Sequence, residues 1–269
     1  MKHTKCLMES AILLGVAAVL SALPLVSLPY GGSVTLASLF PLLLLSYRHG
    51  FKWGLPAGIA FGVLQQLLGL SGLSYFTTWQ SVVAVVALDY LLAFGAVGVG
   101  GVFRPLLRTQ RGALVAGGAL VCLLRYACHV ISGATVWAGV SIPTKAALAY
   151  SLIYNATYMV PESIVLLLVA YYLGSVLDFR RETVVRMSGA TTWGGRRRPL
   201  AAVGGFLLMA GLVFDTVWVF SHVQSAETGE FDLSLLAGNF SLWLPVLLVT
   251  ASAVILSVAL SLVTKRRAE

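Results

Sequence analysis

Charged residues are scarce in this chain. Asp, Glu, Lys and Arg together make up 10% of the 269 residues, whereas soluble globular domains carry about 25%. Hydrophobic residues make up 58%, against roughly 45–50% in soluble domains. This balance excludes a water-soluble globule.

Cysteine and catalytic motifs are also scarce. The three cysteines, Cys6, Cys122 and Cys128, show neither a paired pattern nor metal-ligand spacing, so we expect no disulfide, no metal site and no cofactor. The chain lacks a Gly-x-Ser-x-Gly elbow, a His-Glu-x-x-His pair and a glycine-rich phosphate loop with lysine. We therefore predict that the protein is not an enzyme and has no ATP-hydrolysing motor of its own.

Long apolar runs are what the sequence does have. A transmembrane helix needs about 20 mostly apolar residues, and the runs here are continuous, unlike the alternating segments of roughly ten residues in an outer-membrane barrel. We therefore predict an all-α, polytopic membrane protein. The second run is short and carries Pro41, so it is expected to be tilted, broken or only partly spanning. The eight predicted crossings are Met8–Leu28, Val34–Tyr47, Trp53–Leu70, Trp79–Phe103, Gly112–Ala138, Ala146–Leu177, Leu200–Phe220 and Leu242–Val263.

Basic residues predict the orientation of these crossings. All of the 18 lysines and arginines except Arg125 and Lys145 fall in segments on the side that holds both chain ends. Because cytoplasmic loops carry the excess of Lys and Arg, both termini are predicted to be cytoplasmic, in a bacterial-type cell membrane. Basic clusters this short, between apolar runs, predict no nucleic-acid partner. The first helix resembles a signal peptide but is expected to be retained, because no soluble domain follows it.

The domain organisation is predicted from one change in composition. After Leu177 comes a basic, glycine-containing stretch that runs to Arg198. We therefore expect a six-helix unit at residues 1–178, a basic cytoplasmic linker at 179–199, and an appended hairpin of two transmembrane helices at 200–269.

The fifth predicted crossing carries polar groups at membrane depth, where they are costly and mark functional sites by default. Arg125, His129, Gly133 and Trp137 recur every four residues, so they form one stripe along a helix. A cation, an imidazole, a gap and an indole on one face argue against lipid contact. Gly133 leaves room for a flat group to lie against the helix beneath Trp137.

Two other crossings bring polar groups to similar depths. Asp89 lies ten residues into the fourth crossing, which is about 15 Å at ~1.5 Å per residue. With its neighbour Tyr90, and with Tyr150 and Asn155 in the outer half of the sixth crossing, it supplies a carboxylate, aromatic walls and neutral donors. That set suits an aromatic ligand with positive charge and ring nitrogens. The loop at 71–78, with Tyr75, is expected to cover such a pocket.

Three further ionisable groups are expected to act otherwise. Arg125 is expected to hold Asp89 or a backbone carbonyl, since a like charge would oppose a cationic ligand. Glu162 and Asp215 do not join the cluster by depth and helix, so we interpret them as packing or gating groups. The alternative for all of these residues is that they pair among themselves and only fix helix packing.

The first crossing carries small residues at the spacing that lets another helix approach closely. They are Ala11, Gly15, Ala18 and Ala22. We predict that Ala11, Gly15 and Ala18 dock a partner helix, and an intramolecular contact is the alternative.

Residues 36–177 resemble a known family, the thiamine-binding S-component of energy-coupling factor (ECF) vitamin transporters. This is the substrate-capturing membrane subunit of a vitamin importer. The stretches that carry the resemblance are PLLLLSYRHGFKWGLPAGIAFGVLQQLLG (Pro41–Gly69), ALDYLLAFGAVGVGGVFR (Ala87–Arg104), RYACHVISGATVW (Arg125–Trp137) and AYSLIYN (Ala149–Asn155).

The resemblance implies a fold, a ligand and partners. It implies a six-helix protein that binds thiamine near the outer face and couples to a scaffold membrane subunit and two ATPase subunits, with the small residues of the first helix as the docking face. The implied ligand contacts are Asp89, Tyr90, His129, Trp137, Tyr150 and Asn155, with Gly133 lining the pocket and Tyr75 in the loop.

The sequence departs from the family pattern in three places. Asp89 stands where the family has Glu, one methylene longer. The aromatic residue expected in the first external loop is missing, apart from Tyr30. The hairpin from Leu200 onward has no counterpart in the six-helix pattern.

These residues predict a subunit that captures thiamine, or a close analogue or precursor, from outside. The first alternative is a self-contained ion-coupled carrier for a small cationic or aromatic solute, with Asp89, Glu162 and Asp215 as proton relays. The second alternative is a structural or regulatory membrane protein without a saturable ligand.

Overall fold

The computed structural model describes residues 2–27, 32–140, 144–187 and 240–266, together with a set of positions between 203 and 222. The chain divides into two compact units, Met1–Val185 and Arg186–Glu269. Each unit is described by itself.

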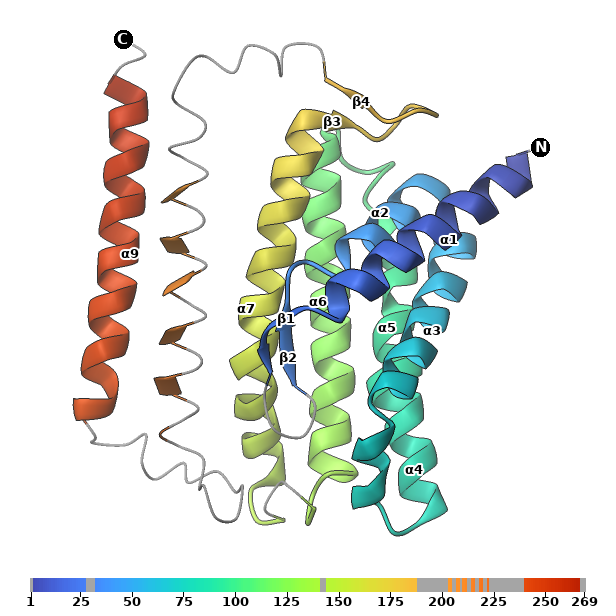
Figure 1. Ribbon diagram of the computed structural model, residues 1–269, viewed down its shortest axis with the longest axis vertical. Helices are drawn as coiled ribbons and strands as arrows, with labels where there is room; N and C mark the ends of the chain where they lie inside the picture. Colours follow the sequence, from blue (N-terminus) through green and yellow to red (C-terminus); the bar gives the residue numbers. More distant parts are fainter. Residues whose placement is uncertain are drawn as a thin grey trace. The chain divides into compact units, whose positions relative to one another are not determined.

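The first unit is a helical bundle (Figure 1). Helix α6 packs along α7, and α3 packs against the span that follows it in the chain. The main helices are α1 (Lys2–Ser21), α2 (Phe40–His49), α3 (Phe51–Leu68), α6 (Gln110–Thr135) and α7 (Ala147–Val176). This confirms the predicted all-α fold class, to which the structure adds only short strands.

Five helices within the described residues are long and apolar enough to cross a membrane. Of the other predicted crossings, α2 has ten residues and α3 has 18, and the crossing at Leu200–Phe220 is described only at scattered positions. The five candidate spans are His3–Ser21, Trp79–Gly101, Gln110–Thr135, Ala147–Val176 and Phe240–Leu260. The protein is therefore a multi-pass membrane protein.

The fourth span changes its helical type along its length. It begins as α4 (Trp79–Val85), widens into the π-helix η3 (Val86–Leu92), returns to α5 (Ala93–Gly95) and ends as the 3-10 helix η4 (Ala96–Gly101). Turns of π-helix inside longer helices are rare and are frequent at functional sites. Here the π-helical segment carries Asp89 and Tyr90.

Glycines bring α3 against the backbone of this span. A Cβ atom on Gly58 would lie 2.4 Å from the carbonyl oxygen of Phe94, and one on Gly62 would lie 2.4 Å from that of Tyr90. Only residues without a side chain allow so close an approach. The spacing of four residues on α3 therefore sets the position of the π-helical segment.

The segment between α1 and α2 corrects the sequence prediction. Residues 8–28 and 34–47 were expected to be helical, but α1 ends at Ser21 and two short antiparallel strands follow, β1 (Pro24–Ser27) and β2 (Ser33–Thr35). Pro24 cannot continue a helix without losing a hydrogen bond. Pro41 then stands in the first turn of α2, where proline is favoured. The apolar composition of the run concealed these breaks.

Arg48 at the end of α2 ties three segments together. Its guanidinium donates to the carbonyl oxygens of Phe179 (2.8 Å), Arg181 (2.9 Å) and Glu182 (2.9 Å), and it pairs with Glu9 of α1. The segment it contacts follows α7 and includes β3 (Leu177–Asp178) and ends in β4 (Val185–Arg186). One cation therefore holds α1, α2 and the chain after α7.

The second unit contains α9 (Phe240–Arg266). Described positions between 203 and 222 contact it: Ser257 donates to the carbonyl oxygen of Gly204 at 2.7 Å, and Thr250 donates to Asp215. Asp215 thus has a packing contact within this unit. Residues 188–202, which include most of the predicted linker, lie outside the described residues, so the predicted division of the chain at 178 and 199 stays a prediction.

Candidate functional site

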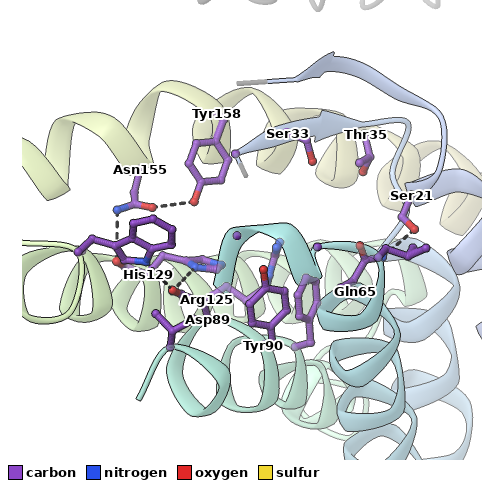
Figure 2. Close-up of a pocket in the computed structure, with 18 of the residues that line it drawn as sticks. Ser21, Ser33, Thr35, Gln65, Asp89, Tyr90, Arg125, His129, Asn155 and Tyr158 are labelled. Atoms are coloured by element: carbon purple, nitrogen blue, oxygen red, sulfur yellow. Dashed lines mark hydrogen bonds and ion pairs between the residues drawn. The ribbon is translucent and has the colours of Figure 1, made fainter. Parts of the chain in front are cut away.

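The first unit encloses a cavity of about 560 Å³. This lies within the ~300–1,000 Å³ typical of small-molecule sites. Its walls come from the end of α1, β2, α3, the 3-10 helix η2 (Leu70–Tyr75), η3, α6 and α7. Figure 2 shows the polar side chains of α6, α7 and η3 gathered along it.

Asp89 is the centre of a hydrogen-bonded group. Its Oδ1 lies 2.8 Å from Nδ1 of His129, and its Oδ2 accepts from the hydroxyl of Ser132 at 2.6 Å and from the indole N–H of Trp137 at 3.1 Å. The π-helical segment thus delivers one carboxylate to two donors of α6, His129 and Ser132, and to Trp137, which lies two residues beyond the end of that helix. Two donors on Oδ2 and one on Oδ1 leave Oδ1 with a lone pair for a further donor.

His129 lines the cavity and has one ring nitrogen without a partner among the described residues. A carboxylate only accepts hydrogen bonds, so the contact with Asp89 places the proton on Nδ1. Nε2 is buried and has no partner among the residues that the structure describes, and His129 lines the cavity. A buried polar atom without a partner is costly. Nε2 is therefore set to accept a hydrogen bond from a ligand.

Asn155 of α7 lies beside this group. Its amide nitrogen donates to the carbonyl oxygens of Ser151 (2.9 Å) and His129 (3.3 Å), and its Oδ1 accepts from the hydroxyl of Tyr158 at 2.7 Å. Figure 2 shows Asn155 and Tyr158 next to each other on α7, joined by this hydrogen bond. Asn155 therefore fixes the spacing between the two helices that carry His129 and Tyr158.

Aromatic rings close the other side of the cavity. The Trp137 ring meets Phe76 edge-on, with centroids 4.7 Å apart, and Tyr75 at 6.2 Å. Residues 71–75 of η2, including Tyr75, line the cavity, and they belong to the loop that was expected to cover it. Stacked and edge-on rings of this kind bind flat or cationic groups.

An ion pair lies at the floor of the cavity. Nη1 of Arg125 lies 3.5 Å from Oε2 of Glu162, and Oε1 of Glu162 lies 3.2 Å from the hydroxyl of Thr35. The guanidinium also lies over the ring of Phe94, 4.8 Å from its centroid. The expectation that Arg125 holds Asp89 or a backbone carbonyl is wrong, because Glu162 takes that place. Glu162 itself, set apart in the sequence, lines the cavity.

The structure brings most of the predicted ligand residues together. Asp89, Tyr90, His129, Gly133, Trp137, Asn155 and Tyr75 all line the cavity, whereas Tyr150 is not part of its described lining, so the ligand contact of Tyr150 stays a prediction. Polar residues that sequence reasoning missed also line it, namely Ser21, Ser33, Thr35, Ser38, Gln65, Tyr154 and Tyr158. Tyr158 had a signal, since it follows Asn155 by three residues and Tyr154 by four, both of which are helical spacings.

The predicted docking residues lie on the open side of α1. Ala11 and Gly15 are exposed and Ala18 is half-buried, and a Cβ atom on Gly15 would meet nothing within 4 Å among the described residues. On the opposite side, Ala17 is fully buried. The small residues thus leave a smooth exposed strip on the first unit.

The first unit is similar to known proteins. A family model described as thiamine transporter protein matches residues 7–179. The thiamine transporter ThiT of Bacillus subtilis (strain 168) is 35% identical over 170 residues, which cover 59% of this chain and 84% of that protein. A solved structure of ThiT from Listeria monocytogenes covers 65% of this chain and 95% of its own, with a TM-score of 0.54 and 23% identity. This last likeness shows a shared fold.

Proposed function

The chain belongs to the thiamine transporter protein family, and on that premise we propose that it is the subunit that captures thiamine, or a close analogue or precursor, from outside the cell. The observation that carries the proposal is the Asp89–His129 pair, with Nε2 of His129 buried and without a partner among the described residues, on the wall of a cavity.

The chemistry of thiamine matches this arrangement. Its aminopyrimidine ring carries an exocyclic amino group that donates hydrogen bonds, and Nε2 of His129 and Oδ1 of Asp89 are acceptors. Its second ring, the thiazolium, is a flat cation, for which the rings of Trp137, Tyr75 and Tyr90 supply faces. A ligand without the amino group would leave buried acceptors unpaired, which supports selectivity.

Uptake needs an energy source, which we propose to be a partner. The resemblance to S-components of ECF transporters implies a scaffold membrane subunit and two ATPase subunits. The exposed strip of Ala11, Gly15 and Ala18 on α1 supports docking of the scaffold there, because small residues allow close helix approach. Lys and Arg are in excess in the segments that lie on the same side of the membrane as the two chain ends. This excess supports cytoplasmic termini.

Titration of the purified protein with thiamine by calorimetry tests the proposed ligand. We expect saturable binding of thiamine. His129→Ala removes the imidazole that pairs with the carboxylate of Asp89 and accepts a hydrogen bond from the ligand, so the affinity should fall by at least tenfold. His3→Ala is the matched control, because His3 is an exposed histidine of α1 and does not line the cavity. Equal affinity in both variants would remove the assignment of His129.

The second candidate function is an ion-coupled carrier that works without ATPases. The observation in its favour is that two carboxylates, Asp89 and Glu162, line one cavity, as proton relays in carriers do. Proteoliposomes that contain this chain alone distinguish the two candidates. Thiamine accumulation driven by a proton gradient would support the carrier, whereas uptake only after addition of the scaffold and ATPases would support the S-component.

A further inference from the structure

The floor of the cavity has no role in the binding scheme above. Arg125 and Glu162 are 5% and 6% exposed, yet they share one contact of 3.5 Å. Nε of Arg125 has no hydrogen-bond partner among the described residues. A guanidinium that is buried, incompletely paired and open to a cavity is by itself an anion site. What opposes that character is the carboxylate of Glu162.

The charges that line the cavity set what it accepts. The ionisable groups of fixed sign in the described lining are Asp89, Arg125 and Glu162, which leave one negative charge in excess. That excess matches a ligand with one positive charge. Without Glu162, the carboxylate and guanidinium would cancel, and the floor would attract an anion.

The floor lies close to the level where the ligand rings would bind. Arg125 precedes His129 by four residues on α6, and Glu162 follows Tyr158 by four residues on α7. Four residues of helix rise about 6 Å. A charged group on either end of a bound thiamine-sized ligand therefore interacts electrostatically with Arg125 and Glu162. This interaction is weakly screened, because the ion pair is buried.

The carboxylate of Glu162 is held in place from a third segment. The hydroxyl of Thr35, in β2, lies 3.2 Å from Oε1 of Glu162 and 2.8 Å from Oγ of Ser38. Ala37, between these two residues, has a φ of +53°, a conformation that costs a residue with a side chain about 1–2 kcal/mol. The loop thus keeps the hydroxyl of Thr35 beside Glu162 in spite of local strain.

We infer that Glu162 is a specificity-determining residue: by pairing with Arg125 it prevents the floor from binding an anion, so the cavity selects the unphosphorylated thiamine cation over its phosphate ester. The inference rests on the proposed function. A phosphate adds up to two negative charges next to a cavity that is already negative, and the only described guanidinium of its lining is engaged by Glu162.

The test compares the dissociation constants of thiamine monophosphate and thiamine by calorimetry. In the wild type, we expect the phosphate ester to bind at least tenfold more weakly. Glu162→Gln keeps the shape and frees Arg125, so the ratio of the two constants should fall by at least tenfold. The double variant Arg125→Gln with Glu162→Gln removes the anion site again and should restore a ratio well above that of the single variant. Glu9→Gln, an acid outside the cavity, should leave the ratio unchanged.

The outcomes separate this inference from the proposed function. A wild type that does not bind thiamine overturns the proposed function, and the inference with it. A wild type that binds both ligands equally, or a Glu162→Gln variant that binds thiamine with an unchanged ratio, overturns only the inference. If Glu162→Gln fails to fold with Arg125 unpaired, Glu162→Asp decides the question. It keeps the charge but shortens the side chain by one methylene and so loosens the contact with Arg125, and a ratio equal to that of the wild type would overturn the inference.

Discussion

Asp89→Asn is the sharpest perturbation of the proposed site, because it changes charge without changing shape. In the wild type, Asp89 accepts from His129 at 2.8 Å, from Ser132 at 2.6 Å and from Trp137 at 3.1 Å. An asparagine has one oxygen to accept with and an NH₂ group that only donates. If its oxygen serves Ser132 and Trp137, its NH₂ group faces Nδ1 of His129.

The substitution therefore reverses the proton pattern of the imidazole. Nδ1 must become the acceptor, and the proton moves to Nε2, the nitrogen that has no partner among the described residues. The ligand amino group then meets a donor in place of an acceptor, and the thiazolium loses its counter-charge. A hydrogen bond to a charged group contributes about 1.5–3 kcal/mol, so we expect thiamine affinity to fall by roughly 10- to 150-fold.

Calorimetric titration of the purified variant measures this loss, and far-UV circular dichroism verifies the fold. The matched control is Ser132→Ala, which removes one neutral donor from Asp89 but keeps the charge and the imidazole proton pattern. Its expected cost is about 0.5–1.5 kcal/mol, or less than about 13-fold. An Asp89→Asn variant that binds thiamine as well as Ser132→Ala does would refute the reasoning about His129.

Three further substitutions test the scaffold around the site. Gly62→Ala places a methyl group 2.4 Å from the backbone oxygen of Tyr90, so thermal unfolding should show a loss of about 1–3 kcal/mol; Gly15→Ala, with open space around it, is the control and should leave stability within about 0.5 kcal/mol. Ala37→Gly relieves a φ of +53° and should stabilise the unit by about 0.5–1 kcal/mol, and a lower melting temperature would contradict this. Tyr158→Phe removes the donor to a buried amide oxygen and should cost about 1–3 kcal/mol of stability, with weaker thiamine binding by titration; an unchanged affinity would show that the amide does not depend on this bond.

The long helices and the stripe of ligand residues on α6 could be predicted from the sequence. His129 and Gly133 lie four residues apart on α6 and therefore share one face. Trp137 was predicted to continue this stripe, but it lies beyond the end of α6 at Thr135 and still lines the cavity. The depth of Asp89 could also be predicted, because the number of residues from the start of a helix gives the depth of a side chain within a few ångströms. Such local rules also gave the all-α fold class and the loop that carries Tyr75.

The floor of the cavity could not be predicted in this way. Glu162 lies deeper on α7 than Asn155 does, so depth alone separated it from the ligand residues. Glu162 pairs with Arg125 in the cavity and is held there by Thr35 of β2. Thr35 lies in the run that the sequence predicts as a helical crossing at 34–47. Pairing between segments 127 residues apart, as for Thr35 and Glu162, depends on tertiary packing and leaves no periodic signal.

The cavity is assembled from residues between Ser21 and Glu162, so nearly the whole first unit must be folded before a ligand can be held. Occupancy and folding are therefore thermodynamically linked, and vitamin at 100 times its dissociation constant would add about 2.7 kcal/mol to the stability of the unit. A cell short of the vitamin would then hold its importer in the least stable form, the one most open to proteolytic turnover.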